Sequence, residues 1–325
     1  MSFLKIPGRR WLWPSLALAA ILLANLFLSP NFFSIRIVDG HLFGSLIDIL
    51  HRGTPLAFVA LGMAVVIATG GIDLSVGAII AICGATMAVL LKTSGLPPVL
   101  VLLAVVAVGI LCGLWNGLLV AFLDIQPIVA TLILMVAGRG IAQMITDGQI
   151  VTFHSDFFQV IGGGFFLGLP VRVLVVLGFA ILLALVLRRT AMGLFLEAVG
   201  GNAAASRLAG IEARWIRLSA YAISGLCSAL AGIVLTADIK GADANNAGLW
   251  LELDAILAVV IGGAALKGGR FALGLTLIGV LVIQSLTTTI LVSGLPSQYT
   301  LVVKACVVLA VLFLQSPRLQ RLRAQ

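Results

Sequence analysis

The sequence predicts an all-α fold, a polytopic membrane helical bundle of about ten transmembrane helices with both termini cytoplasmic. Three observations support this class: 61% of the 325 residues are hydrophobic, only 10% are charged, and the apolar residues form long runs. A soluble domain carries about 25% charged residues. Because a soluble protein of this composition could not cover its surface with polar groups, lipid is the solvent that suits it.

A transmembrane helix needs roughly 20 apolar residues, and fewer where the helix is broken. Ten stretches have this character, and we expect them to form a single domain over residues 1–325. They are residues 13–30, 54–69, 72–91, 98–123, 125–146, 168–188, 218–237, 252–266, 271–293 and 298–315. The boundary between the second and third stretches depends only on Gly70 and Gly71.

The basic residues predict the orientation, because cytoplasmic segments of membrane proteins carry an excess of Lys and Arg. With the N-terminus inside and ten alternating spans, the inside segments hold 13 basic residues and the outside segments hold 5. The net charge of +8 therefore indicates topology rather than nucleic-acid binding. Four long connections result, with residues 31–53, 147–167 and 238–251 outside and residues 189–217 inside.

The sequence lacks the motifs of several enzyme classes. It contains no G-x-x-x-x-G-K-[ST] phosphate-binding loop and no H-E-x-x-H zinc motif. His41, His51 and His154 are widely separated, and the four cysteines lie singly in apolar runs. We therefore expect no catalytic residue, no metal site and no cofactor on this chain. A proton pump is also disfavoured, because most acidic residues lie near the ends of the expected spans.

The inner loop 189–217 contains signals for a short capped helix. Asn202 can accept hydrogen bonds from free N–H groups at the helix start, Ala203 to Ala209 are mostly helix formers, and Gly210 can adopt the left-handed conformation that ends a helix. A compact helix on the cytoplasmic face suits insertion into a groove on a partner protein. It suits a solvated connection between two spans equally well, so the residues alone favour neither interpretation.

Several motifs occur in an order that indicates a transporter family. They are Gly-Gly-Ile-Asp-Leu-Ser-Val-Gly at residues 70–77, Asn116-Gly117, Pro-x-x-x-Thr-Leu at 127–132, Arg139-Gly140, and Glu-Leu-Asp-Ala-Ile-x-Ala-Val-Val-Ile-Gly-Gly at 252–263. Over about residues 50–315, the chain resembles the ribose/xylose/galactose-type sugar permeases of ABC importers. Residues 242–250 look like the galactofuranose-importer branch. Many ribose-type members have Gly-Gly-x-Gly near residue 268, where this chain has Gly-Gly-Arg-Phe.

The resemblance implies the transmembrane subunit of an ATP-driven importer in the bacterial inner membrane. Its substrate would be a monosaccharide, either galactofuranose or a related pentose or hexose. Two permease subunits, identical or related, would form the pathway. A separate ATPase chain would bind ATP and Mg, and a periplasmic sugar-binding protein would deliver the sugar. An ion-coupled secondary carrier and a membrane scaffold without transport activity are the alternatives.

The same resemblance makes residues 189–217 a cytoplasmic coupling loop. The residues expected to contact the ATPase are Glu197, Ala198, Gly200, Asn202, Ala204, Arg207 and Gly210. Polar residues of the expected spans, and of one outer loop, are candidates for lining the translocation pathway. These candidates are Asp73, Ser75, Asn116, Arg139, Asn246, Glu252 and Asp254.

Some of these pathway candidates also have structural interpretations. Asp73 could N-cap the third span at the cytoplasmic surface, which the expected topology favours, or it could belong to a broken helix that lines a cavity. For Arg139 we favour an ion pair with an acidic residue of a neighbouring span over a place in the pathway. Asn116 could instead bridge two helices. Lys304 is expected near the outer surface, where it could extend its ammonium group to water.

Overall fold

The computed structural model describes residues 9–28, 32–38, 40–294, 299, 301–306 and 309. These residues are mainly helical, which confirms the expected class, and seven of their helices are long and apolar enough to cross a membrane. The seven are α2 (Ser45–Ala68), α3 (Val76–Thr93), α4 (Pro98–Ala121), α5 (Pro127–Ile145), α7 (Val171–Arg189), α10 (Ala213–Ile239) and α12 (Leu273–Val292).

The other described helices do not meet these criteria of length and composition, so ten full-length spans are not confirmed. The first expected span corresponds to α1 (Arg9–Leu28), which contains a shorter apolar helix, and the eighth to α11 (Leu251–Ile261), which has only 11 residues. The tenth, 298–315, falls largely outside the described residues. Three further helices belong to the connections: α6 (Asp156–Gly163), α8 (Met192–Gly201) and α9 (Ala203–Leu208).

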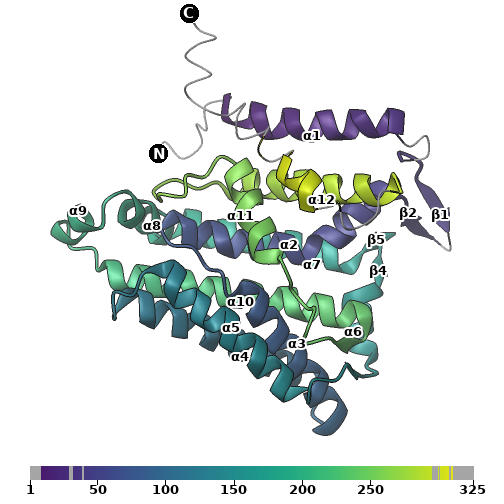
Figure 1. The fold of residues 1–325 in the computed structure, drawn as a ribbon, viewed down its shortest axis with the longest axis horizontal. Coiled ribbons are helices and arrows are strands. Elements are labelled where there is room, and N and C mark those ends of the chain that lie inside the picture. The colour runs from purple at the N-terminus through teal and green to yellow at the C-terminus, as the bar shows by residue number, and fades with distance from the viewer. Residues whose placement is uncertain are drawn as a thin grey trace, which may run out of the picture.

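Three small antiparallel strand pairs also belong to the connections. They are β1 (Arg36–Val38) with β2 (His41–Phe43), β3 (Val151–Thr152) with β6 (Gly241–Ala242), and β4 (Phe165–Phe166) with β5 (Leu169–Pro170). Figure 1 shows β1, β2, β4, β5 and α6 at the right of the bundle, and α8 and α9 at the left. We call these two ends the hairpin end and the α8–α9 end.

The helices alternate in direction between these two ends, as the sequence predicts for consecutive spans. The α8–α9 end also receives the start of α1, since Trp11 contacts Gly274 near the start of α12. Several basic residues belong to helix ends and connections on this side: Arg188, Arg189, Arg207, Arg214, Arg217, Lys267 and Arg270. Fewer basic residues belong to the described segments at the hairpin end, so the charge bias agrees with a cytoplasmic α8–α9 end.

The central helix of the bundle is α10, which packs against α2, α3 and α4. It has 27 residues and is therefore about 40 Å long. Glycines allow this packing, because a Cβ on Gly113 of α4 would lie 2.3 Å from the carbonyl oxygen of Tyr221. A Cβ on Gly225 of α10 would lie 2.2 Å from the carbonyl oxygen of Gly109. Small residues thus let the two helices meet backbone to backbone.

This contact predicts a strong dependence of stability on Gly113. We expect Gly113→Ala to lower the free energy of unfolding by about 1–3 kcal/mol, because the added methyl group has no space. Gly178→Ala is the matched control, since a Cβ at this helical glycine of α7 meets nothing within 4 Å. Thermal unfolding of the purified protein in detergent measures both variants. Equal midpoints for the two would contradict the close α4–α10 contact.

Candidate functional site

The chain between α2 and α3 is not helical, and side chains from other helices bind its backbone. Tyr221 of α10 donates a hydrogen bond to the carbonyl oxygen of Ile72 at 3.5 Å. Thr131 of α5 accepts one from the N–H of Leu74 at 3.1 Å. Because lipid offers no partners to free backbone groups, such side chains make a break inside a membrane bundle possible.

Asp73 is the centre of a fully buried hydrogen-bond cluster at this break. Its Oδ1 accepts from the backbone N–H of Ser75 at 3.0 Å and from the Ser75 hydroxyl at 2.6 Å. Its Oδ2 accepts from the Ser224 hydroxyl at 2.7 Å, and Asn116 Nδ2 donates to Ser75 Oγ at 2.7 Å. All four side chains are 0% exposed. We call Asp73, Ser75, Asn116 and Ser224 the Asp73 cluster.

The position of this cluster corrects the expectation of a surface N-cap. Ser75, and not Asp73, is the N-cap residue of α3. Ser224 lies 11 residues beyond the start of α10, so the cluster is about 16 Å from that end of the helix. Asp73 therefore belongs to a broken helix inside the bundle. In this conformation the cluster side chains face one another, and their place in the pathway stays a prediction.

The break is joined to α8 by direct backbone contacts. The N–H of Gly269 donates to the carbonyl oxygen of Ala68, the last residue of α2, at 2.9 Å. A Cβ on Gly200 of α8 would lie 1.7 Å from that same oxygen. Gly268, with a φ of +88°, lies against Gly70 and Gly200. We call Ala68, Gly200, Gly268 and Gly269 the glycine junction.

The inner connection forms two helices, where the sequence predicted one. The predicted caps are confirmed: Asn202 Oδ1 accepts from the N–H of Ala205 at 3.0 Å at the start of α9, and Gly210 follows α9 with a φ of +83°. Ala204 and Arg207 are exposed on α9, whereas Ala198 is half-buried on α8. Their contact with an ATPase stays a prediction.

Glu197 of α8 is half-buried and faces the chain that leads into α12. Burial raises the pKa of its carboxyl group, while a hydrogen bond from the Phe271 N–H and the positive charge of Arg270 oppose this shift. The Glu197 side chain thus helps to fix α8 to the segment that contains Gly268 and Gly269. This packing role is distinct from the direct ATPase contact that the sequence predicted.

The expected outer loop 238–251 does not stay at the outer surface. Ala242 packs with Ala88 of α3, and Ala244 packs with Ala81 and Ala85. Gly248 then lies against Gly77, where its Cβ position is 2.7 Å from the Gly77 carbonyl oxygen. Between Ala88 and Gly77 the chain descends about 16 Å along α3. We call residues 243–250 the re-entrant segment.

Arg139 of α5 holds the re-entrant segment. Its Nη1 donates to the carbonyl oxygens of Ala247 at 2.6 Å and Ala244 at 3.2 Å. Among the residues that the structure describes, no carboxylate lies within 4 Å of Arg139, so the favoured ion pair is wrong. The guanidinium instead satisfies carbonyl groups that have no helical partners, which explains a charge at this depth.

The pathway candidates of the re-entrant segment and α11 lie in different environments. Asn246 is exposed, and its Nδ2 donates to Asp243 Oδ2 at 2.7 Å. Glu252 is buried, and its Oε2 has no hydrogen-bond partner among the described residues. Asp254 pairs with Lys304 at 2.7 Å. Lys304 is buried, so the expectation that it extends to the outer surface is wrong.

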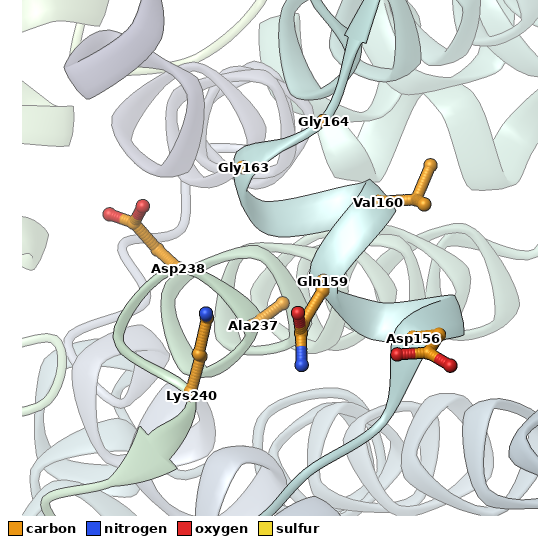
Figure 2. A pocket seen from close by; sticks show the side chains of 8 residues that line it. All are labelled: Asp156, Gln159, Val160, Gly163, Gly164, Ala237, Asp238 and Lys240. Atoms are coloured by element: carbon orange, nitrogen blue, oxygen red, sulfur yellow. The ribbon is translucent and has the colours of Figure 1, made fainter.

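A shallow cavity of about 350 Å³ lies at the hairpin end, between α6 and the end of α10. Figure 2 shows its lining, with polar side chains from both elements. They are Asp156, Gln159, Asp238 and Lys240. Asp238 also pairs with the buried Arg172 of α7 at 2.8 Å, which fixes the two helix ends together.

Several residues of these sites were missed in the sequence. Ser224, Tyr221 and Thr131 bind the break, and Gln143 bonds to Asn245 of the re-entrant segment. Each missed helical residue is polar in an apolar helix, which is the signal that could have found it. Within the described part of the chain, no three His, Cys, Asp or Glu side chains gather as a possible metal site.

Broken helices of this kind recur in membrane transporters. The family model for the permease component of the branched-chain amino acid transport system matches residues 45–312. The chain belongs to this permease family. The matched region includes the inner connection, the break between α2 and α3, the re-entrant segment and the Asp73 cluster.

Related permeases with assigned substrates cover almost the whole chain. The galactofuranose transporter permease of Escherichia coli (strain K12) is 56% identical over 317 residues, which cover 96% of this chain and 93% of the relative. The fructose import permease of Bifidobacterium longum is 40% identical, covering 88% and 81%. The ribose import permease of Bacillus subtilis is 40% identical, covering 83% and 84%. No solved structure matches the permease.

The Asp73 cluster predicts energetic coupling between the break and α10. Ser224→Ala leaves a buried carboxylate oxygen without its donor, so we expect a loss of about 1–3 kcal/mol in the free energy of unfolding. In the double variant Asp73→Ala/Ser224→Ala, we expect the loss in the free energy of unfolding to be smaller than the sum of the two single losses by about 0.5–3 kcal/mol. Denaturant unfolding in detergent measures this cycle.

Ser219→Ala serves as the control on the same helix. The Ser219 hydroxyl bonds only to the carbonyl oxygen of Ile216 within α10. We expect this variant to change the free energy of unfolding by less than about 0.5 kcal/mol. A loss as large as that of Ser224→Ala, or strict additivity in the double variant, would contradict the cluster.

Proposed function

We propose that this permease is the transmembrane subunit of an ATP-driven importer of galactofuranose or a closely related monosaccharide. The observation that carries the proposal is the 56% identity to a galactofuranose transporter permease over 96% of the chain. The ribose and fructose permeases are less similar, at 40% identity or below. The importer lies in the bacterial inner membrane, with both termini and the α8–α9 end in the cytoplasm.

The importer has three kinds of partner. A second permease subunit, identical or related, completes the pathway, and a periplasmic sugar-binding protein delivers the sugar at the hairpin end. An ATPase on another chain binds ATP and Mg and docks on α9. Leu208 supports this docking surface, because it is 92% exposed on a helix outside the bundle. An apolar side chain this exposed suits a groove on a partner.

The glycine junction supports a route for coupling. The ATPase moves α9, which only Asn202 separates from α8, and Gly200 lies in the last turn of α8. Gly200 leaves no room between α8 and Ala68, so displacement of α8 reaches the end of α2. The break that follows Ala68 then moves with it. Motion of packed elements of this kind exposes a central pathway alternately to the two sides of the membrane.

Uptake by proteoliposomes that contain the permease complex tests this proposal. We expect uptake of galactofuranose to require the ATPase, ATP, Mg and the binding protein, and to exceed uptake of ribose and fructose. An ATPase variant that binds but does not hydrolyse ATP is the control. Uptake by the permease alone, driven by an ion gradient, would instead establish a secondary carrier. Absence of all solute uptake by an assembled complex would support a scaffold.

The docking of the ATPase on α9 predicts a specific effect of Leu208. We expect Leu208→Ser to reduce the amount of ATPase that copurifies by about tenfold, because burial of a leucine contributes about 1.5–3 kcal/mol. Leu167→Ser is the matched control, since Leu167 is 88% exposed at the hairpin end. Normal ATPase binding by Leu208→Ser, or equal losses in both variants, would contradict the docking surface.

A further inference from the structure

An exposed polar surface lies on α5 and the re-entrant segment. Gln143 of α5 and Asn245 of the re-entrant segment are both exposed, and Gln143 Nε2 donates to Asn245 Oδ1 at 2.7 Å. Asn246 is exposed beside them. Asp243, partly exposed, completes this group. We call Gln143, Asp243, Asn245 and Asn246 the amide wall.

The amide wall is held in a fixed arrangement. Asp243 Oδ1 accepts from the backbone N–H groups of Asn245 at 3.0 Å and Asn246 at 3.2 Å, and its Oδ2 accepts from Asn246 Nδ2 at 2.7 Å. Arg139 holds the same segment from its buried side. The described residues offer no partner to Asn245 Nδ2 or Gln143 Oε1. These polar atoms are therefore ordered and available to a ligand.

Gln143 lies in the last turn of α5, and the re-entrant part of the amide wall lies further below the hairpin end, along α3. Ala244, which precedes Asn245, packs with Ala81 and Ala85 of α3, and Gly248 lies against Gly77. Ala85 lies eight residues before the end of α3 at Thr93, or about 12 Å below the hairpin end of that helix. Amide and carboxylate groups at this depth are costly in hydrocarbon. The surface must therefore face water or another polar surface.

We propose that the amide wall binds the sugar in the outer half of the pathway, a site that rests on the proposed function. Amide and carboxylate groups both donate and accept, which suits the hydroxyl groups of a neutral monosaccharide. The Nη1 group of Arg139 donates to backbone carbonyls, and the carboxylates of Glu252 and Asp243 lie near enough to interact with its charge. Trp250, the last residue of the segment, is half-exposed and offers an apolar ring face.

Cysteine accessibility tests whether the amide wall faces the pathway. The assembled importer carries Asn245→Cys in a Cys306→Ser background, because Cys306 is exposed. We expect a membrane-impermeant thiol reagent, added from the periplasmic side, to label residue 245, and sugar-loaded binding protein to slow this labelling. Leu111→Cys is the control: Leu111 is 63% exposed on the apolar α4 and should not be labelled.

Uptake measurements test whether the wall binds the sugar. Gln143→Leu and Asn246→Leu should each lower uptake by about tenfold through loss of hydrogen bonds to the sugar, with ATPase copurification unchanged. Wild-type uptake in both variants, or a residue 245 that is unlabelled and instead forms a disulfide with the second permease subunit, would overturn the site. If the unmodified complex imports no monosaccharide, the proposed function fails and the sugar assignment with it, even where residue 245 is labelled.

Discussion

Backbone groups that leave regular helix inside a membrane must find partners within the protein, and the permease meets this constraint twice. At the break between α2 and α3, the partners are Tyr221 and Thr131. In the re-entrant segment, Arg139 binds two carbonyl groups. Two helices, α5 and α10, therefore supply side chains to segments that are distant in sequence, and the positions of both segments depend on them.

The two irregular segments meet at the start of α3. A Cβ on Gly77 would lie 2.5 Å from the carbonyl oxygen of Gly248 and 2.6 Å from Glu252 Oε2. Only glycine allows this approach, as it does at Gly200 against Ala68. Backbone contacts therefore run from α8 through the glycine junction and the break to the re-entrant segment. Gly77, Gly200, Gly248 and Gly268 allow these close approaches.

The sequence predicted those features that depend on local chemistry. Apolar runs predicted most of the helices, and Asn202 and Gly210 predicted the ends of α9 because capping involves only neighbouring residues. The path of residues 238–251 could not be predicted, since a polar run has the same composition whether it is solvated or re-entrant. The partner of Arg139 was also missed, because backbone carbonyls carry no sequence signal. The depth of a segment in the bundle and the partner of a side chain both depend on tertiary contacts, which the local sequence does not specify.

The buried Asp73 cluster and the exposed amide wall affect helix movement in different ways. The Asp73 cluster connects the break to α4 and α10, and glycine contacts hold α4 against α10. Separation of the break from α4 and α10 would take the Ser224 donor from the buried Asp73 carboxylate and the Ser75 acceptor from Asn116, which is costly. The break, α4 and α10 therefore move as one body when α8 displaces the end of α2. In the proposed mechanism the pathway opens along a surface outside this cluster, and the amide wall on α5 and the re-entrant segment is such a surface.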